Sequence, residues 1–364
     1  MRIIEVIERL ENFAPLSLQE DYDNAGLLVG NSQDECTGII TTLDVTEELV
    51  KEAINKKCNL IVSHHPIIFR GLKKLNGTNY VERTVISAIK NNIAVYAIHT
   101  NLDNIITGVN NKIAEKLQLQ NIKVLQPKEG ILKKLVTFVP KKNAEEVRNA
   151  LFKVGGKFGV YSECSFNVEG TGTFKAGKEA DPYVGEIGKR HEENETRIEV
   201  IFPAYSLEKI VKSLKDAHPY EEVAYDIYSL NNQLTDIGSG LTGNLIHSIS
   251  EDEFLSNLKR EFKLKVVRHS PFINRTIRKI AICGGAGSFL ISQAKASGAD
   301  AYVTSDIKYH DFFDADSKIL MADVGHYESE QFTIELLADI LKEKFPNFAV
   351  LKTEINTNSV NYYT

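Results

Sequence analysis

The stretch NLIVSHHP, residues 59–66, joins a short apolar run to two adjacent histidines and a proline. A run of this length, rich in aliphatic residues, is typical of a buried strand. Proline cannot continue a strand inside a sheet, so the strand ends here. The segment therefore predicts a strand end that carries the imidazoles of His64 and His65. The alternative to a pair of ligands is that one ring packs in the interior and the other is solvated, because neighbouring strand residues point to opposite faces.

Two further strand-like runs end in similar residues. AVYAI precedes His99, with Asp103 four positions later, and ILMADV precedes His326 and Glu330. His326 and Glu330 lie four positions apart at the start of a helical stretch, so both side chains lie on one helix face. The alternative is an ordinary solvent-exposed pair, because a His and a Glu at this spacing are common on helix surfaces. In an open parallel α/β sheet, the loops beyond the carboxyl ends of the strands gather at one edge, where ligands bind. Three such strand ends together predict a metal site.

The residue types indicate the kind of metal site. Imidazole and carboxylate ligands without a thiolate suit Zn, Mn, Fe, Co or Ni. Three histidines and two carboxylates exceed one tetrahedral site, and a carboxylate that bridges two ions would use them all. The four cysteines show no C-x-x-C spacing, which argues against a cysteine zinc site and a disulfide framework. They are predicted to be buried free thiols: Cys36, Cys58, Cys164 and Cys283.

Several motifs carry a family resemblance: LDVT, SHHP, HTNLD, CGGAGS, TSD, and GH followed by Glu330. They resemble the Nif-three-like dinuclear metal centre family, whose members are also named GTP cyclohydrolase I type 2 homologues, over nearly the whole chain. The resemblance implies that His64 and Asp103 hold one metal ion. It implies that His65 and His326 hold the other and that Glu330 bridges both. It also implies a toroidal homohexamer whose metal sites face an internal cavity.

The chain contains two βαβ units of matching length, at residues 38–63 and 279–304. The first opens into the histidine pair, and the second opens into Ser305 and Asp306. The units predict two related α/β lobes that share the site. The alternative is that the two βαβ units are unrelated and match in length and layout by chance.

The expected domains are a first α/β lobe at residues 1–130, an insertion at 131–232 and a second α/β lobe at 233–364. Within the insertion, strands at 134–140 and 197–203 both end in proline, and each precedes a helix. This order predicts a ferredoxin-like α+β domain. It resembles the PII-like or CutA-like insertion of longer family members.

Composition limits the functional classes. A chain of 364 residues is too long for a single ordinary hydrophobic core, which indicates two or three domains. Its net charge of -6 argues against a protein built for non-specific nucleic-acid binding. No apolar run reaches the roughly 18 residues that a membrane span needs. The N-terminus predicts an amphipathic helix rather than a signal peptide, and with unpaired cysteines this places the protein in a reducing cytoplasm. The apolar face of that helix comprises Ile3, Ile4, Ile7 and Leu10.

A glycine-rich loop follows the predicted strand at residues 279–283. Its backbone N–H groups can hold a phosphate, although it lacks the lysine and hydroxyl pair of a P-loop. A tight strand-to-helix turn is the alternative. The loop residues of interest are Gly284, Gly285, Gly287 and Ser288.

Other polar residues are candidates for proton transfer, namely His99, Asp306 and His310. His99 can instead orient a ligand, as can Asp44. A helix N-cap role is the alternative for Asp306. His218 precedes a proline, which favours a helix-ending turn over a ligand role.

The chemistry that follows is typical of a hydrolase. Two divalent ions per chain, with Zn favoured over Mn, Fe, Ni or Co, would lower the pKa of a water and stabilise negative charge on an attacked centre. A nucleotide-like or phosphoester substrate fits these residues better than GTP ring opening, because no cysteine accompanies the histidines as in zinc cyclohydrolases. The alternative is a non-catalytic toroidal scaffold that binds single-stranded nucleic acid or a protein partner.

Overall fold

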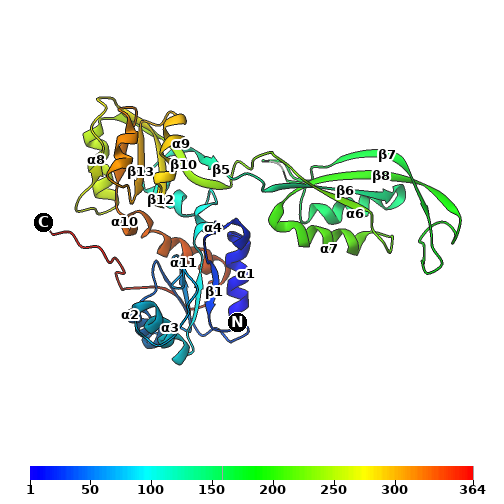
Figure 1. Cartoon of the computed structure of the whole chain (residues 1–364), viewed down its shortest axis with the longest axis horizontal. Helices are drawn as coiled ribbons and strands as arrows, with labels where there is room; N and C mark the ends of the chain where they lie inside the picture. Colours follow the sequence, from blue (N-terminus) through cyan, green and yellow to red (C-terminus); the bar gives the residue numbers. More distant parts are fainter. Residues whose placement is uncertain (158, 364) are drawn as a thin grey trace. The chain divides into compact units, whose positions relative to one another are not determined.

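The computed structural model describes residues 1–157 and 159–363. The chain forms two compact units (Figure 1). Unit 1 comprises Met1–Pro127 and Asp236–Thr364, and unit 2 comprises Lys128–Thr235. The expected insertion, residues 131–232, lies inside unit 2. Over the described residues, no helix combines the length and the apolar character that crossing a membrane requires.

The first sheet of unit 1 has the order β1-β4-β3-β2-β15. Its strands are β1 (Gly26–Val29), β2 (Ile39–Thr42), β3 (Leu60–Ser63), β4 (Ala94–Ala97) and β15 (Val350–Lys352). All neighbours are parallel except β1 and β4. Helices α2 (Glu47–Asn55) and α3 (Tyr80–Lys90) pack on one face, and α11 (Thr333–Lys344) contacts β2, β15 and α1 (Ile3–Phe13).

The second sheet of unit 1 has the order β11-β14-β13-β12-β10-β5. Its strands are β5 (Gln120–Pro127), β10 (Gly238–Ile249), β11 (Arg268–His269), β12 (Ile277–Ala286), β13 (Ala301–Ser305) and β14 (Leu320–Asp323). The central three, β12 to β14, are parallel, and the others pair antiparallel. Helices α5 (Val109–Lys116) and α8 (Glu251–Glu261) cover one face, whereas α9 (Ile291–Ala296) covers the other.

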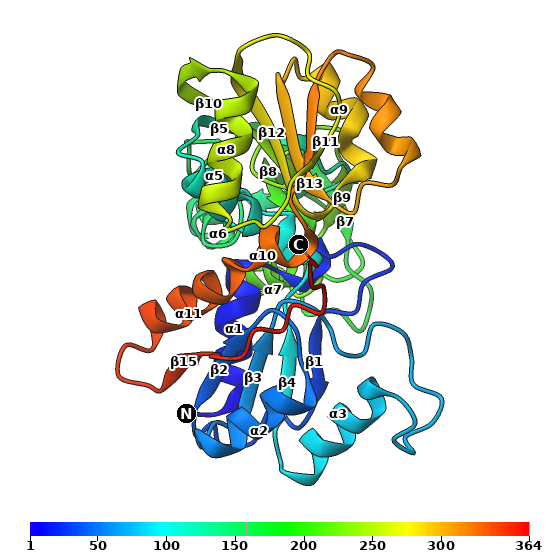
Figure 2. The same cartoon turned by 90° about the vertical axis from the view of Figure 1, so that its left-hand side faces the viewer.

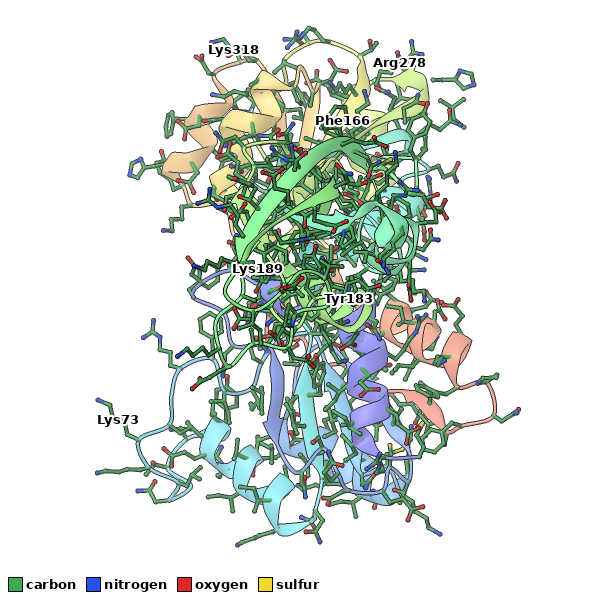
Figure 3. The ribbon with its side chains drawn as sticks, turned by 90° about the vertical axis from the view of Figure 1, so that its right-hand side faces the viewer. Lys73, Phe166, Tyr183, Lys189, Arg278 and Lys318 are labelled. Atoms are coloured by element: carbon green, nitrogen blue, oxygen red, sulfur yellow. The ribbon has the colours of Figure 1, made fainter. Side chains whose placement is uncertain are left out.

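Unit 2 contains β6 (Leu132–Pro140), α6 (Ala144–Phe152), β7 (Phe166–Lys175), β8 (Arg190–Pro203), α7 (Leu207–Ala217) and β9 (Tyr225–Ser229). The sheet order β7-β8-β6-β9 is antiparallel throughout, and both helices pack on one apolar cluster. This is the ferredoxin-like arrangement that the sequence predicts. Figure 3 labels Phe166 at the start of β7, and Tyr183 and Lys189 in the connection between β7 and β8.

The structure confirms an α/β protein with two related lobes and an inserted α+β domain. The bounds expected for the second lobe, residues 233–364, differ from the strand pairing in the structure. β5 precedes the insertion but pairs with β10, and β15 returns to pair with β2 in the first sheet. Sequence pattern reveals a strand but not its partner, which explains the difference.

Side-chain caps explain where several helices begin. Thr46 accepts a hydrogen bond from the Leu49 amide at the start of α2, and Ser250 accepts one from the Glu253 amide at the start of α8. Such caps satisfy amides that have no partner within the helix. In the N-terminal helix α1, Val6 is buried where Ile4 was expected.

The cysteines are free over the described residues, as the sequence predicts. Three are buried, namely Cys36, Cys58 and Cys283, whereas Cys164 is half-buried.

Candidate metal centre

The two sheets of unit 1 contribute to one cluster of histidines and carboxylates. His64 and His65 follow β3, and Asp103 ends the short helix α4 (Thr100–Asp103) after β4. His326 and Glu330 begin and end α10 (His326–Glu330), which follows β14. Figure 2 shows α10 between the two sheets. The carboxyl ends of parallel strands from both lobes therefore supply the cluster, as expected for an α/β binding site.

Glu330 lies at the centre of the cluster, and its two oxygens face different partners. Its Oε1 lies 3.8 Å from His64 Nε2, which is itself 3.6 Å from Asp103 Oδ1. Its Oε2 lies 3.0 Å from His65 Nε2 and 3.1 Å from His326 Nε2. The two latter nitrogens are 3.3 Å apart. The carboxylate thus separates a His64–Asp103 pair from a His65–His326 pair.

Three polar atoms of the cluster are buried without a hydrogen bond of regular geometry: His64 Nε2, Asp103 Oδ1 and Glu330 Oε2, the last despite its short distances to two imidazole nitrogens. Buried polar atoms in folded proteins are normally hydrogen-bonded, since an unpaired one destabilises the fold. Atoms of these three kinds are metal ligands. A cation between His64 Nε2 and Asp103 Oδ1 would satisfy those two atoms, and a cation beside His65 and His326 would satisfy Glu330 Oε2. The donor set therefore fits a metal ion.

Oxygen atoms fix the orientation of the histidines from the first lobe. His64 Nδ1 lies 2.9 Å from the Ile98 carbonyl, which can only accept a hydrogen bond. His64 therefore carries its proton on Nδ1 and directs the lone pair of Nε2 into the cluster. His65 Nδ1 lies 2.7 Å from Asp44 Oδ1 in the same arrangement. Such partners orient metal-binding imidazoles, which is the role expected for Asp44.

The same pattern holds for His326 and His99. His326 Nδ1 lies 2.7 Å from Asp306 Oδ2, and His99 Nδ1 lies 2.7 Å from Asp23 Oδ1. The N-cap alternative for Asp306 is wrong, because the next helical turn begins after Tyr309. Asp23 was missed from the sequence, since it lies in an irregular segment 76 residues from His99.

The remaining proton-transfer candidates have different surroundings. The ring of His99 packs 5.2 Å from that of His64 and 5.4 Å from that of His65, measured between centroids. A ring nitrogen of His99 can join those of this histidine pair around one ion. His310 is exposed and packs against Tyr309 and Phe313 instead.

The charges in the cluster are strongly coupled. Burial opposes ionisation of Glu330, but the surrounding imidazoles outweigh it and hold its pKa well below the usual range. Burial likewise opposes a proton on His65 and His326, but nearby carboxylates raise their pKa values to about 10 and about 9. Burial lowers the pKa of His64. A cation in the cluster would replace the protons on His65 and His326 as the positive charge that neutralises the Glu330 carboxylate.

Burial and the charge of Glu330 raise the pKa of Asp103 well above its usual range. Burial, with Asp103 and Glu330 nearby, also raises the pKa of the Cys283 thiol. A protonated thiol is a poor metal ligand, so the cluster relies on nitrogen and oxygen.

The glycine-rich loop forms a wall of the cluster. The Gly284 amide donates to Asn110 Oδ1 at 2.9 Å, and the Gly285 amide donates to Ser329 Oγ at 3.0 Å. Neither amide is free to bind a phosphate, contrary to the phosphate-loop interpretation. A Cβ at Gly285 would lie 2.3 Å from Glu330 Oε1, and φ is +63° there. Glycine at this position lets the Glu330 carboxylate approach the strand end.

The other two loop residues also pack inside the second lobe. A Cβ at Gly287 would lie 2.2 Å from Thr304 Oγ1, and Ser288 begins the short turn η4 (Ser288–Leu290). The loop thus resembles the tight strand-to-helix turn that was the alternative.

Comparisons with known proteins agree over the full length. The Duf34/NIF3 (NGG1p interacting factor 3) family model matches residues 1–359. The chain is 38% identical over 360 residues to a Bacillus subtilis protein, covering 97% of this chain and 96% of the relative. It is 36% identical to a Staphylococcus epidermidis protein, covering 100% of both. Both relatives are named GTP cyclohydrolase 1 type 2 homolog.

Solved structures give the same result. A Bacillus cereus protein related to NIF3 has a TM-score of 0.86 and 37% identity, covering 100% of this chain and 99% of that one. A Staphylococcus aureus structure has a TM-score of 0.79 and 31% identity with the same coverage. Since the family model, the relatives and the structures all match from end to end, the chain belongs to the Duf34/NIF3 family.

Proposed function

We propose that this protein is a hydrolase of phosphoesters that depends on two divalent metal ions. The observation that carries the proposal is the position of Glu330, whose two oxygens each face a different pair of ligand groups. A carboxylate between two groups of ligands is the arrangement that a dinuclear centre needs. Divalent ions in such a centre activate a water and neutralise charge on a phosphoryl group.

Each residue of the cluster has a proposed role in binding the ions or in orienting a ligand. His64 and Asp103 would hold one ion and His65 and His326 the other, with Glu330 shared. Asp44 and Asp306 hold the imidazoles of the second pair in place through Nδ1.

His99 is the proposed proton acceptor for the attacking water. Its Nδ1 proton is held by Asp23, which leaves Nε2 with a lone pair beside the cluster.

The test uses tag-free protein loaded with Zn, Mn, Fe, Co or Ni in turn. Release of phosphate or nitrophenol is measured for 4-nitrophenyl phosphate, bis(4-nitrophenyl) phosphate and GTP. We expect turnover with at least one metal, lost in His64→Ala and kept in the control His269→Ala, which lies on β11 and stacks against Phe272. Two bound ions without turnover would contradict the hydrolase and favour the scaffold.

We also infer a homohexamer from the family resemblance. Sedimentation equilibrium of the metal-loaded protein tests this assembly. A mass six times that of the chain supports it, and a monomer mass contradicts it.

A further inference from the structure

An exposed aromatic pair borders the metal centre. The rings of Tyr22 and Phe69 lie 6.3 Å apart between centroids, and these residues are 66% and 45% exposed. Phe69 also packs edge-on against His99, at 6.3 Å and an interplanar angle of 80°. Because the His99 ring packs against both His64 and His65, a single imidazole separates the pair from the predicted ligands.

Hydrogen bonds tie this pair to the centre. Asp23, the neighbour of Tyr22, is the residue that holds His99 Nδ1. Asn24 Nδ2 donates to the Ile68 carbonyl at 2.5 Å, which joins the segment of Tyr22 to the loop that carries Phe69. The segment that orients His99 through Asp23 therefore also holds the two rings near the cluster, and both aromatic residues remain exposed.

The loop that carries Phe69 is cationic. Residues 66–79 directly follow the histidine pair and contain three basic residues but no Asp or Glu, in a chain whose net charge is -6. A cavity of about 470 Å³ lies along this loop, within the usual size of small-molecule sites. Lys73, labelled in Figure 3, lies on the loop. Three basic residues line the cavity with Phe69, namely Arg70, Lys73 and Lys74. Glu82 also lines it, and its carboxylate accepts hydrogen bonds from Thr78 and Asn79 of the loop.

Among residues 1–157 and 159–363, none of the carboxylates forms an ion pair with Arg70, Lys73 or Lys74. Exposed cations next to exposed aromatic rings are the two elements that proteins combine to bind nucleotides, with the rings stacking on bases and the cations contacting phosphates.

We propose that Tyr22, Phe69 and the loop 66–79 form a substrate subsite for nucleotides. The base stacks on Phe69 with Tyr22 beside it, since the two rings are tilted by 54°, and the loop cations bind phosphates that do not react. This assignment rests on the proposed function for the identity of the reacting ester, and it narrows the substrate from any phosphoester to one that carries an aromatic base. Binding at the subsite does not require turnover.

The test compares two probes that differ by the nucleoside: adenosine 5′-(α,β-methylene)diphosphate and methylenediphosphonate. Titration calorimetry uses the metal-loaded full chain, and metal content is measured for every variant. We expect Phe69→Ala to weaken binding of the nucleotide roughly 10-fold, as loss of a stacked base does, and to leave methylenediphosphonate binding unchanged. Phe69→Trp should restore nucleotide binding. Lys73→Ala with Lys74→Ala should weaken both probes.

Phe272→Ala is the matched control, because Phe272 is 44% exposed and stacks on His269. The proposal is overturned if the wild type binds neither probe, if Phe69→Ala leaves nucleotide binding unchanged, or if it weakens both probes equally. Nucleotide binding that depends on Phe69 without any hydrolysis would sustain the subsite and contradict the hydrolase. Hydrolysis that does not distinguish nucleotides from 4-nitrophenyl phosphate or glycerol phosphate would contradict the subsite alone.

Discussion

The two lobes of unit 1 share a parallel βαβ core, but they contribute differently to the candidate metal centre. In the first lobe, β3 leads directly into two candidate ligands, and an orienting carboxylate, Asp44, follows the neighbouring strand β2. In the second lobe, β13 leads into the orienting carboxylate Asp306, and the candidate ligands come from α10 after β14. The ends of equivalent strands thus carry candidate metal ligands in one lobe and, in the other lobe, a carboxylate that orients a candidate ligand. The scaffold sets where side chains meet, and the residue at each end sets the chemistry.

The lobes also differ in how far they enclose the centre. The side chain of His64 is fully buried, whereas that of His326 is 39% exposed. His64 is therefore enclosed and His326 faces solvent, whereas the side chains of Asp103 and His65 are both partly buried, at 26% and 21% exposed. This difference leads to several expected outcomes.

The largest effect is expected at the carboxylate that both sides share. Glu330→Gln removes the charge with little change of shape, and a neutral amide cannot bridge two cations. Metal content should fall from about two ions per chain to nearly none in elemental analysis. Glu328→Gln, on the same helix but hydrogen-bonded to Asn358, should keep the wild-type content. Full metal content in Glu330→Gln would exclude the bridge.

The next effect separates the two sides. His64→Ala should lose the ion of the His64–Asp103 pair and His326→Ala that of the His65–His326 pair, leaving about one ion per chain in each variant. Elemental analysis after dialysis gives both numbers. If either substitution removes both ions, the sides bind cooperatively and the division between them is wrong.

The carboxylates that support the histidines should have smaller effects. Asp44→Asn and Asp306→Asn keep a hydrogen-bond acceptor but lose the charge that raises the basicity of the ring. Loss of such partners weakens metal affinity roughly 10- to 100-fold, which competition with a chelator measures. Equal losses in both variants would show that the supports are equivalent despite their different strands. Asp316→Asn, an exposed site paired with Lys318, is the control.

Metal affinity should also depend on pH. The pKa values of His65 and His326 are raised to about 10 and about 9, so both carry protons at neutral pH before a cation binds. Binding must displace these protons, and affinity should therefore rise with pH until about 9 to 10. Calorimetry in buffers of different ionisation enthalpy counts the released protons. His326→Ala should release fewer, and unchanged release would argue against the assignment.

The smallest effect concerns the caps of helices that support the lobes. Thr46→Ala in the first lobe and Ser250→Ala in the second each remove one acceptor from an α-helix start. The free energy of unfolding should fall by about 1 kcal/mol in each, as measured by denaturant titration. Metal content should remain unchanged. A change of metal content would show that the caps influence the strand ends beside them.

Much of this architecture could be predicted from local sequence. The apolar runs before His64, His99 and His326 indicated strands, and the structure places all three histidines just beyond strand ends. The repeated strand and helix order between the lobes indicated the ferredoxin-like domain, which the antiparallel order of unit 2 confirms. These features follow from periodicity and turn-forming residues, which act over a few neighbours.

Other features could not be predicted in this way. Asp23 supports His99 from 76 residues away, and Gly285 leaves room for a carboxylate that follows it by 45 positions. The glycine-rich loop had the composition of an anion site, yet its Gly284 and Gly285 amides donate to Asn110 and Ser329. Composition describes what a loop can bind, and only packing decides which of its groups stay free.

Local sequence patterns specify the strand ends, the residue types that they carry and the order of the inserted domain, because hydrophobic period and chain direction are local properties. The packing of distant segments, in contrast, turns the two oxygens of Glu330 toward different pairs of candidate ligands, adds β15 to the first sheet, and places an aromatic pair beside the centre. Those arrangements depend on which distant loops meet, and that is settled when the lobes bury their apolar faces together.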